Sequence, residues 1–392
     1  MRVVQIPRKE LLLKELQEIG VDPNAIPIFQ NKAEYLTIKL EGLSPAQANI
    51  LKQTSLICGA DTAIPKGAYG GDKRKKFTVL LFANKREIEK IITRLTEQPG
   101  MEKIKDCLFE FITEKDLPVL KLNGDEIKFH RTYIMGIINI SPDSFYSGSR
   151  YTTSSTVKKV IEEMEKEGAD FIDIGAESTR PGAEMVTEEE ELRRLKAILP
   201  VAMKTARIPI SVDTYKPAVA EFAIDQGVKI INDISGLGFN KMMAKIIAKN
   251  RVGVVVMHIK GTPKTMQINP QYKNLMDEIH NYLKARIQFA IDCGIERERI
   301  IIDPGLGFGK RLEDNYEIIE RLGELKIFNR PILVGPSRKS FIGKPFGLEP
   351  EERLEGTLAV EALLIKNGAS ILRVHDVAEA KKVALLIDRI TK

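Results

Sequence analysis

Polar residues recur at the ends of eight short apolar runs in the second part of the chain. The runs are YIMGIIN (133–139), FIDIGAE (171–177), PISVDT (209–214), KIINDIS (229–235), GVVVMH (253–258), IIIDPG (300–305), PILVGPS (331–337) and SILRVH (370–375). The residues at their ends are Asn139, Glu177 with Ser178, Asp213, Asn232 with Asp233, His258, Asp303, Ser337 and His375. Each one, taken singly, is also typical of a helix cap or a loop hydrogen bond. Together they indicate a single polar site built from many strand ends.

The acceptor-rich part of this set consists of Asp213, Asn232 and Asp303. Carboxylates supply acceptors only, whereas an amide supplies an acceptor and a donor group. This combination suits a flat heterocycle that carries ring N–H and exocyclic amino donors. The alternative is that the three side chains orient one another or cap helices.

A second group is cationic and comprises Arg180, Lys339, Arg373 and His375, with Arg338 adjacent to Lys339. Basic residues at strand ends and near helix N-termini favour an anion site. Arg373 and His375 are two residues apart in an apolar strand, so they face the same way. The alternative is a network of surface salt bridges.

The sequence lacks the motifs of several other classes of enzyme. The sequence has no G-x-S-x-G motif, and its three cysteines, Cys58, Cys107 and Cys293, form no C-x-x-C pair. His258 and His375 lack the spacing of a zinc protease, and the glycines of 305–310 do not match a Walker phosphate loop. A phosphate or diphosphate transfer or displacement remains compatible with the inventory.

The elements that position these residues read as parallel strands. Near-continuous apolar runs that alternate with helical stretches are typical of strands covered on both faces. Eight such units in 261 residues predict a (β/α)8 TIM-type barrel, in which chemistry lies at the carboxyl ends of the strands. A doubly wound open sheet is the competing architecture. The long segments after Asn139 and Glu177 suit either lids or plain connections.

The residues before the barrel predict a smaller α+β domain. Helices are expected at 8–19, 44–56 and 84–95, strands at 35–40, 77–82 and 108–113, and an exposed loop at 59–76. The expected domains are an extension at 1–117, a connector at 118–131 with a turn at Asn123-Gly124, and the barrel at 132–392.

Composition narrows the class further. The net charge is +6, from 60 Lys+Arg against 54 Asp+Glu, and no strongly basic domain emerges, so nucleic acid is not an expected partner. No apolar stretch is long enough for a membrane span, and the amino terminus is too charged for a signal peptide. Dispersed cysteines and the missing export signals predict a cytoplasmic protein.

Seven motifs carry a resemblance to a known family. They are MGIINISPDSF (135–145), ESTRPGA (177–183), VDT (212–214), INDISG (231–236), DPGLGFGK (303–310), GPSRKSF (335–341) and RVHDV (373–377). In this order, each near a predicted strand end, they closely resemble dihydropteroate synthase, an enzyme of folate biosynthesis. The resemblance covers residues 132–392 and does not extend to 1–117.

The resemblance implies a transferase that condenses (7,8-dihydropterin-6-yl)methyl diphosphate with 4-aminobenzoate, giving dihydropteroate and diphosphate. It implies Mg²⁺ as cofactor, with Asn139 as its ligand, and a homodimer. The residues that it nominates for catalysis are Lys339, Asp303, Arg373 and His375. The residues that it nominates for substrate binding are Thr179, Asp213, Asn232, Asp303 and Lys339 toward the pterin and its diphosphate, Arg373 and His375 toward the diphosphate, and Arg180, Pro181, Phe308, Ser340 and Phe145 toward the aminobenzoate.

Two features depart from the family pattern. The first loop, PDSFYSGSRY, lacks the acidic residue and glycine pair that commonly follow the Phe-Ser, and the extension at 1–117 is unusual. The extension has three interpretations: a regulatory domain, a dimer-supporting domain or a separate activity. The competing functions for the barrel are a pterin-binding methyltransferase domain, which would lack the GPSRKS and R-x-H anion site, and a non-catalytic pterin-binding scaffold.

Overall fold

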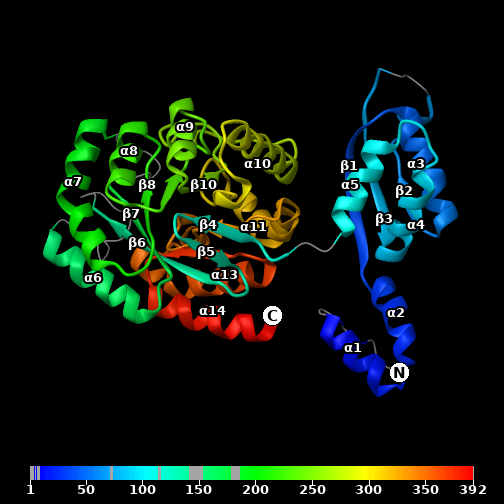
Figure 1. The fold of residues 1–392 in the computed structure, drawn as a ribbon, viewed down its shortest axis with the longest axis horizontal. Helices are drawn as coiled ribbons and strands as arrows, with labels where there is room; N and C mark the ends of the chain where they lie inside the picture. Colours follow the sequence, from blue (N-terminus) through cyan, green and yellow to red (C-terminus); the bar gives the residue numbers. More distant parts are fainter. Residues whose placement is uncertain are drawn as a thin grey trace. The chain divides into compact units, whose positions relative to one another are not determined.

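The structure, a computed structural model, describes Val4, Ile6 and residues 9–70, 74–113, 116–140, 153–177 and 186–391. The chain divides into two compact units, Met1–Asp116 and Leu117–Lys392 (Figure 1). No helix among the described residues is long and apolar enough to cross a membrane.

The described part of the first unit combines a small antiparallel sheet with helices. Its strands are β1 (Tyr35–Leu43), β2 (Asp61–Ala63) and β3 (Phe77–Asn84), in the order β1-β3-β2, and its helices are α1 (Lys9–Glu18), α2 (Ile26–Ala33), α3 (Pro45–Cys58), α4 (Lys85–Leu95) and α5 (Glu102–Ile112). Helix α3 begins at a capping box in which Ser44 Oγ accepts from Gln47 N and the Gln47 side chain accepts from Ser44 N. It ends at Gly59, whose left-handed backbone (φ 89°) is typical of a helix C-terminus.

The structure corrects two expectations in this unit. Residues 108–113 do not form a strand, because 102–112 form helix α5, in which the buried Ile104 and Leu108 lie four residues apart on one face. The expected loop at 59–76 contains strand β2 and a 3₁₀ turn, Lys66–Gly70. The core of the unit gathers large side chains such as Leu51, Leu81 and Ile88.

The second unit is a barrel of eight parallel strands surrounded by helices (Figure 1). The strands are β6 (Tyr133–Asn139), β7 (Phe171–Gly175), β8 (Ile210–Asp213), β9 (Ile230–Asp233), β10 (Gly253–Met257), β11 (Ile300–Asp303), β12 (Leu333–Val334) and β13 (Ile371–Val374). The helices are α6 (Ser154–Glu167), α7 (Glu188–Thr205), α8 (Pro217–Asp225), α9 (Lys241–Asn250), α10 (Leu275–Asp292), α11 (Leu312–Arg321), α12 (Ser340–Gly343), α13 (Leu354–Asn367) and α14 (Val377–Thr391).

The strand order decides between barrel and open sheet. The strands pair as β11-β10-β9-β8-β7-β6-β13-β12, and a parallel bridge between Ile302 and Ile332 joins the two ends. The (β/α)8 barrel is therefore confirmed, and the doubly wound open sheet is wrong.

Residues 118–131, expected as a connector, form a hairpin that belongs to the second unit. Its strands are β4 (Val119–Leu122) and β5 (Asp125–Lys128), joined at Asn123-Gly124, where Gly124 has φ +91°. Leu120 and Leu122 pack with Phe171 and other inward-facing side chains of the barrel strands. The hairpin is thus part of the barrel's interior packing.

Alternation along the strands separates two environments. On β7, Phe171 belongs to the interior cluster, whereas Ile172 and Ile174 belong to the layer shared with the surrounding helices. Asp173 has the same parity as Phe171 and therefore points into the barrel. The same parity places Asn232 and Asp303 inward, two residues beyond the interior Ile230 and Ile301.

Candidate active site

Arg373 lies between two carboxylates at the base of the site. Its Nε is 2.6 Å from Asp173 Oδ2, and its Nη2 is 2.9 Å from Asp213 Oδ2. Burial lowers the pKa of Arg373, but Asp173 and Asp213 outweigh it and keep the pKa above its ordinary value. Burial raises the pKa of Asp213, and Arg373 opposes that rise. The group joins strands β7, β8 and β13.

Asn232 adds the amide. Its Nδ2 donates to Asp173 Oδ2 at 3.1 Å, and the residue is 4% exposed. Because a carboxylate only accepts, the amide nitrogen must face Asp173, and Oδ1 is turned the other way. Asn232 therefore presents an acceptor to the site. Asp173 was missed in the sequence analysis, which looked only at the strand ends.

Lys339 and Asp303 add a second pair of opposite charges, close enough to Arg373 for its charge to affect both pKa values. Asp303 Oδ1 accepts from Gly305 N at 2.6 Å, and burial raises the Asp303 pKa, opposed by Lys339. Burial lowers the pKa of Lys339 to about 8, with Asp303 opposing the shift. Lys339 Nζ donates to Leu306 O and lies 4.6 Å from the centre of the Phe308 ring, a cation–π distance. Phe308 is thus held beside the ammonium group.

The loop from Gly305 to Gly309 follows β11 and requires glycine. Gly305, Gly307 and Gly309 all have positive φ, and a Cβ at Gly305 would stand 2.1 Å from His258 O. At Gly309 a Cβ would stand 2.5 Å from Lys260 O. These glycines let the loop pass close to the end of β10.

Side chains fix the carbonyls of the same loop. Gln267 Nε2 donates to Gly307 O at 2.6 Å, and Tyr272 OH donates to Gly309 O at 2.6 Å. Lys310 Nζ donates to Phe308 O at 3.0 Å. The backbone that carries Phe308 is therefore held from several directions.

His258 does not join the substrate side of the site. It is 4% exposed, and its Nδ1 is 2.9 Å from Lys310 Nζ, which also donates to His258 O at 3.3 Å. Burial lowers the pKa of both side chains, and the nearby Lys310 ammonium lowers the pKa of His258 further. The pair supports the glycine loop instead.

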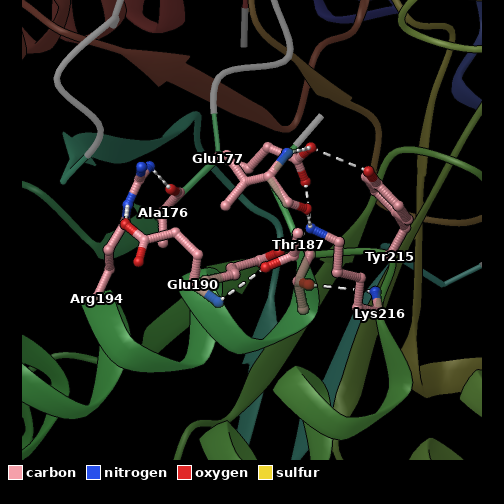
Figure 2. A network of polar contacts seen from close by, with 10 residues as sticks. Ala176, Glu177, Thr187, Glu190, Arg194, Tyr215 and Lys216 are labelled. Carbon is pink, nitrogen blue, oxygen red and sulfur yellow. Dashed lines mark hydrogen bonds and ion pairs between the residues drawn. The ribbon is translucent and has the colours of Figure 1, made fainter. Parts of the chain in front are cut away.

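Two further strand-end carboxylates have structural contacts. Asp233 accepts from Ser235 N and Oγ and from Leu237 N, which closes the turn after β9. Glu177 bonds Lys216 Nζ at 2.8 Å and Tyr215 OH at 3.1 Å (Figure 2). The helix-cap and loop interpretation is correct for these residues.

The network around Lys216 joins both described ends of the 178–185 gap. Lys216 Nζ donates to Glu177, to Val186 O at 2.6 Å and to Glu191 Oε2 at 2.5 Å (Figure 2). Arg194 Nη1 adds a bond to Ala176 O at 2.8 Å. Burial raises the pKa of Glu191, and Lys216 opposes that rise.

In the segment 337–340, the side chains of Arg338 and Lys339 bind different partners. Ser337 Oγ is 2.9 Å from His375 Nδ1 and also accepts from His375 N at 3.2 Å. Arg338 turns away from Lys339 and binds Asp376 through Nε (2.9 Å) and Nη2 (2.8 Å). Arg338 is therefore structural, while exposed Ser340 begins helix α12.

Asn139 ends β6. A Cβ added at Gly175 would stand 3.6 Å from Asn139 Oδ1 and 3.7 Å from Asp213 Cβ, so Asn139 lies near the Asp213 side of the site. Over the described ranges no cluster of three His, Cys, Asp or Glu residues could hold a metal. Mg²⁺ needs no such cluster, because it is usually bound by one or two protein oxygens together with phosphates and water. An amide oxygen at this position fits that kind of site.

Four predicted site residues, Phe145, Thr179, Arg180 and Pro181, lie outside the described residues, as do Ser178 and most of the two long segments (141–152 and 178–185). The structure brings together Asp213, Asn232, Asp303, Lys339 and Arg373, and it adds Asp173. Parity along β7 is the signal that could have identified this residue.

Comparison with known proteins identifies the family of the chain. A profile of the family described as pterin binding enzyme matches residues 135–375. The dihydropteroate synthase of Clostridium beijerinckii is 44% identical over 275 residues, which cover 70% of this chain and 100% of that protein. A crystal structure of dihydropteroate synthase from Thermus thermophilus in complex with 4-aminobenzoate has a TM-score of 0.62 at 35% identity, covering 69% of this chain and 99% of that one.

One relative also matches the extension. The bifunctional dihydropteroate synthase/dihydropteroate reductase of Helicobacter pylori is 32% identical over 383 residues, which cover 96% of this chain and 96% of that protein. The alignments cover the barrel, which also carries the residues of the site. The chain belongs to the dihydropteroate synthase family of pterin-binding enzymes.

Proposed function

We propose that the cluster of Asp213, Asn232, Asp303, Lys339 and Arg373 is where this chain performs the synthase reaction of its family. The reaction joins (7,8-dihydropterin-6-yl)methyl diphosphate to 4-aminobenzoate and releases diphosphate. One observation carries the assignment: the acceptors Asp213, Asn232 and Asp303 meet the half-buried cations Lys339 and Arg373 at the carboxyl ends of the barrel strands. A methyltransferase substrate without a diphosphate would give Arg373 and His375 less to bind.

The pterin ring is assigned to the acceptor side. Asp213, Asp303 and the Oδ1 of Asn232 accept from the ring N–H groups and the exocyclic amine. Lys339 donates to ring oxygen or nitrogen. The raised pKa values of Asp213 and Asp303 support this, because buried carboxyl groups gain most from donors that replace lost water.

The diphosphate is assigned to Arg373, His375 and Thr179, together with Mg²⁺ held by Asn139. When bound, Mg²⁺ would neutralise charge that builds on the departing diphosphate. Ser337 holds the His375 ring through Nδ1, and basic side chains at this strand end favour an anion.

The aminobenzoate is assigned to Phe308, Ser340, Arg180, Pro181 and Phe145. Phe308 offers an aromatic face, and Arg180 a cation for the carboxylate. The Thermus thermophilus structure supports an aminobenzoate site in this fold, since its name records that molecule bound.

The mechanism needs no strong base, because an aromatic amine already carries its lone pair. The methylene–oxygen bond breaks as diphosphate leaves with the bonding electrons, and the pterin ring shares the positive charge at the methylene carbon. The amine lone pair then forms the nitrogen–carbon bond, and one amine proton is lost to water or to the diphosphate. Asp213 and Asp303 stabilise that charge. We infer an SN1-like course. Turnover of ring-substituted aminobenzoates should vary little with amine nucleophilicity, and a steep dependence would contradict this course.

The first experiment measures diphosphate release by the full chain with the pterin diphosphate, Mg²⁺ and 4-aminobenzoate. Release should require both substrates and should fall by about 100-fold or more in Lys339→Ala, the range expected when a charge-stabilising group is removed. Tight pterin binding without turnover would favour the non-catalytic scaffold. Undiminished turnover in the variant would remove Lys339 from the site.

We also propose a cytoplasmic homodimer. The three cysteines are unpaired, which supports a reducing compartment. Helices α13 and α14 pack on each other and expose Leu363, Leu385, Leu386 and Ile390, an apolar set that a second copy would cover. Analytical ultracentrifugation should find a dimer that Leu386→Lys dissociates; a wild-type monomer at all concentrations would contradict it.

For the first unit we propose the second activity in the name of the Helicobacter pylori relative, reduction of dihydropteroate to tetrahydropteroate with two electrons and two protons. That relative matches 96% of this chain, whereas the Clostridium beijerinckii synthase matches 70%. The full chain should oxidise NADH, NADPH or a reduced flavin, the usual hydride donors, only when dihydropteroate is present. No reduction with any of them would leave a regulatory or dimer-supporting role for the unit.

A further inference from the structure

Asp173 is a buried charge that the roles above do not include. It lies in the middle of β7, is fully buried, and points into the barrel with Phe171. Its contacts reach the strands two places away on either side, because β6 separates β7 from β13 and β8 separates β7 from β9. Only an inward-facing side chain can make both contacts.

One oxygen of Asp173 holds two groups of the site. Its Oδ2 accepts from Arg373 Nε at 2.6 Å and from Asn232 Nδ2 at 3.1 Å. Its Oδ1 is buried and has no hydrogen-bond partner among the described residues. A buried carboxylate is costly unless it is paired, so its position calls for a role that an apolar residue could not fill.

The bond to Asn232 decides which end of the amide meets the substrate. Rotating the amide by 180° would set its oxygen against the carboxylate oxygen, which repels it. Asp173 therefore keeps Asn232 Oδ1 turned away as an acceptor. The bond to Arg373 holds Nε in place, so the guanidinium plane is fixed by Asp173 and Asp213 together.

We propose that Asp173 is a positioning residue of the synthase: it orients Asn232 as an acceptor for the N–H groups of the pterin and fixes Arg373 toward the diphosphate. It acts through these two side chains rather than by touching substrate. The inference rests on the proposed function of the site, and it names a residue that the family resemblance did not nominate here.

The test compares two replacements of Asp173 with a matched control. Asp173→Leu removes every acceptor, whereas Asp173→Asn keeps one oxygen that can accept from both donors. Ser211→Ala is the control, because Ser211 is paired in register with Asp173 on β8, is fully buried, and its Oγ has no partner among the described residues. Each variant is checked by its thermal melt before kinetics.

Asp173→Leu should weaken binding of the diphosphate-free hydroxymethyl dihydropterin by about 10-fold or more, as expected when a buried polar group is left mispaired. It should also lower kcat while KM for 4-aminobenzoate stays within about twofold, since neither Asn232 nor Arg373 is assigned to that substrate. Asp173→Asn should fall between Asp173→Leu and wild type, and Ser211→Ala should match wild type. Equal effects on both substrates, or a loss in Asp173→Leu no larger than in Ser211→Ala, would overturn the proposal.

A reciprocal exchange keeps the proposal testable if Asp173→Leu does not fold. Asn232→Asp sets two carboxylates against each other and should weaken pterin binding. Adding Asp173→Asn restores a donor–acceptor pair in the opposite sense, with an oxygen of residue 232 still facing the pterin, and should recover most of the binding. Additive losses would contradict an orienting role.

The failure of this inference is distinguishable from that of the proposed function. An inactive wild-type chain that binds no pterin would remove the proposed function. An active wild-type chain whose Asp173 variants bind pterin normally would remove only the role of Asp173.

Discussion

Replacing Lys216 with methionine should destabilise the second unit more than any exposed lysine replacement. The side chains of Lys216, Glu177 and Glu191 are 11%, 7% and 1% exposed, and one ammonium group serves both carboxylates (Figure 2). Methionine keeps most of the length and apolar contact of lysine but leaves two buried carboxylates without a cation. Breaking a buried ion pair in this way costs about 3–5 kcal/mol.

The loss should depend on pH in a defined direction. Burial already raises the pKa of Glu191, and Lys216 opposes that rise, so removing Lys216 should raise it further. A folded state with a raised carboxyl pKa binds more protons than the unfolded state, and stability falls as pH rises through that interval. The difference between wild type and variant should therefore be largest near pH 7 and smaller near pH 5.

Urea unfolding followed by circular dichroism at the two pH values measures both quantities. The matched control is Lys158→Met on α6, whose pair with Glu162 is more than half exposed on both sides and should be worth no more than about 0.5 kcal/mol. Adding Glu191→Gln to Lys216→Met should restore part of the loss. A loss under about 1 kcal/mol at pH 7, or an equal loss at pH 5, would refute the reasoning.

Three further changes test other parts of the second unit. Glu361 is 1% exposed, and burial raises its pKa to about 8. The free energy of unfolding should therefore fall as pH rises from about 4.5 to 8, by roughly 1.4 kcal/mol per pH unit at most. Urea titrations across pH should show that Glu361→Gln removes this slope. Gly305→Ala should abolish diphosphate release or folding, because its Cβ would stand 2.1 Å from His258 O on a backbone with φ +69°. The lowered pKa of Lys339, about 8, predicts that kcat/KM for the pterin substrate falls as pH rises above about 8, and Lys339→Arg should move that limb to higher pH.

Each of these changes has a control. Parallel stability slopes in wild type and Glu361→Gln would contradict the assignment of the proton to Glu361. Gly347→Ala has a similar φ, +67°, with nothing within 4 Å of its Cβ, so it should remain active and separates backbone strain from the clash at Gly305. An unchanged alkaline limb in an active Lys339→Arg would show that another group titrates.

The barrel could be predicted because parallel strands covered on both faces need continuous apolar runs, and eight of them are present. The helices expected at 44–56 and 84–95 are present as α3 and α4, and each begins at a capping box, at Ser44 and at Asn84. The strand expected at 108–113 was wrong, because a short apolar run with few turn residues suits a strand or a helix equally well. The structure has helix α5 over 102–112. Its packing against α4 in the first unit, invisible in the sequence, decides for the helix.

The polar strand ends separated into two kinds that composition does not distinguish. Asp213 and Asp303 face the site, whereas Asp233 closes its own turn through three hydrogen bonds and His258 meets a lysine from the next loop. Parity sets the direction, because Asp233 directly follows the inward-facing Asn232, and donors on the following residues then hold it in the turn. Ser235, two residues after Asp233, is such a donor, and its position was readable.

Asp173 shows how far the same reasoning extends inside the strands. The parity that set Arg373 and His375 on one side of β13 also sets Asp173 with Phe171 on the inward side of β7. An inward charge in an apolar barrel needs an opposite charge at the same level, because an unpaired one would be too costly to bury. Asp173 and Arg373 are 200 residues apart, yet closure of the barrel leaves only β6 between their strands. Once the barrel is inferred, the two inward charges are each other's expected partners, and the ion pair follows from parity and strand order.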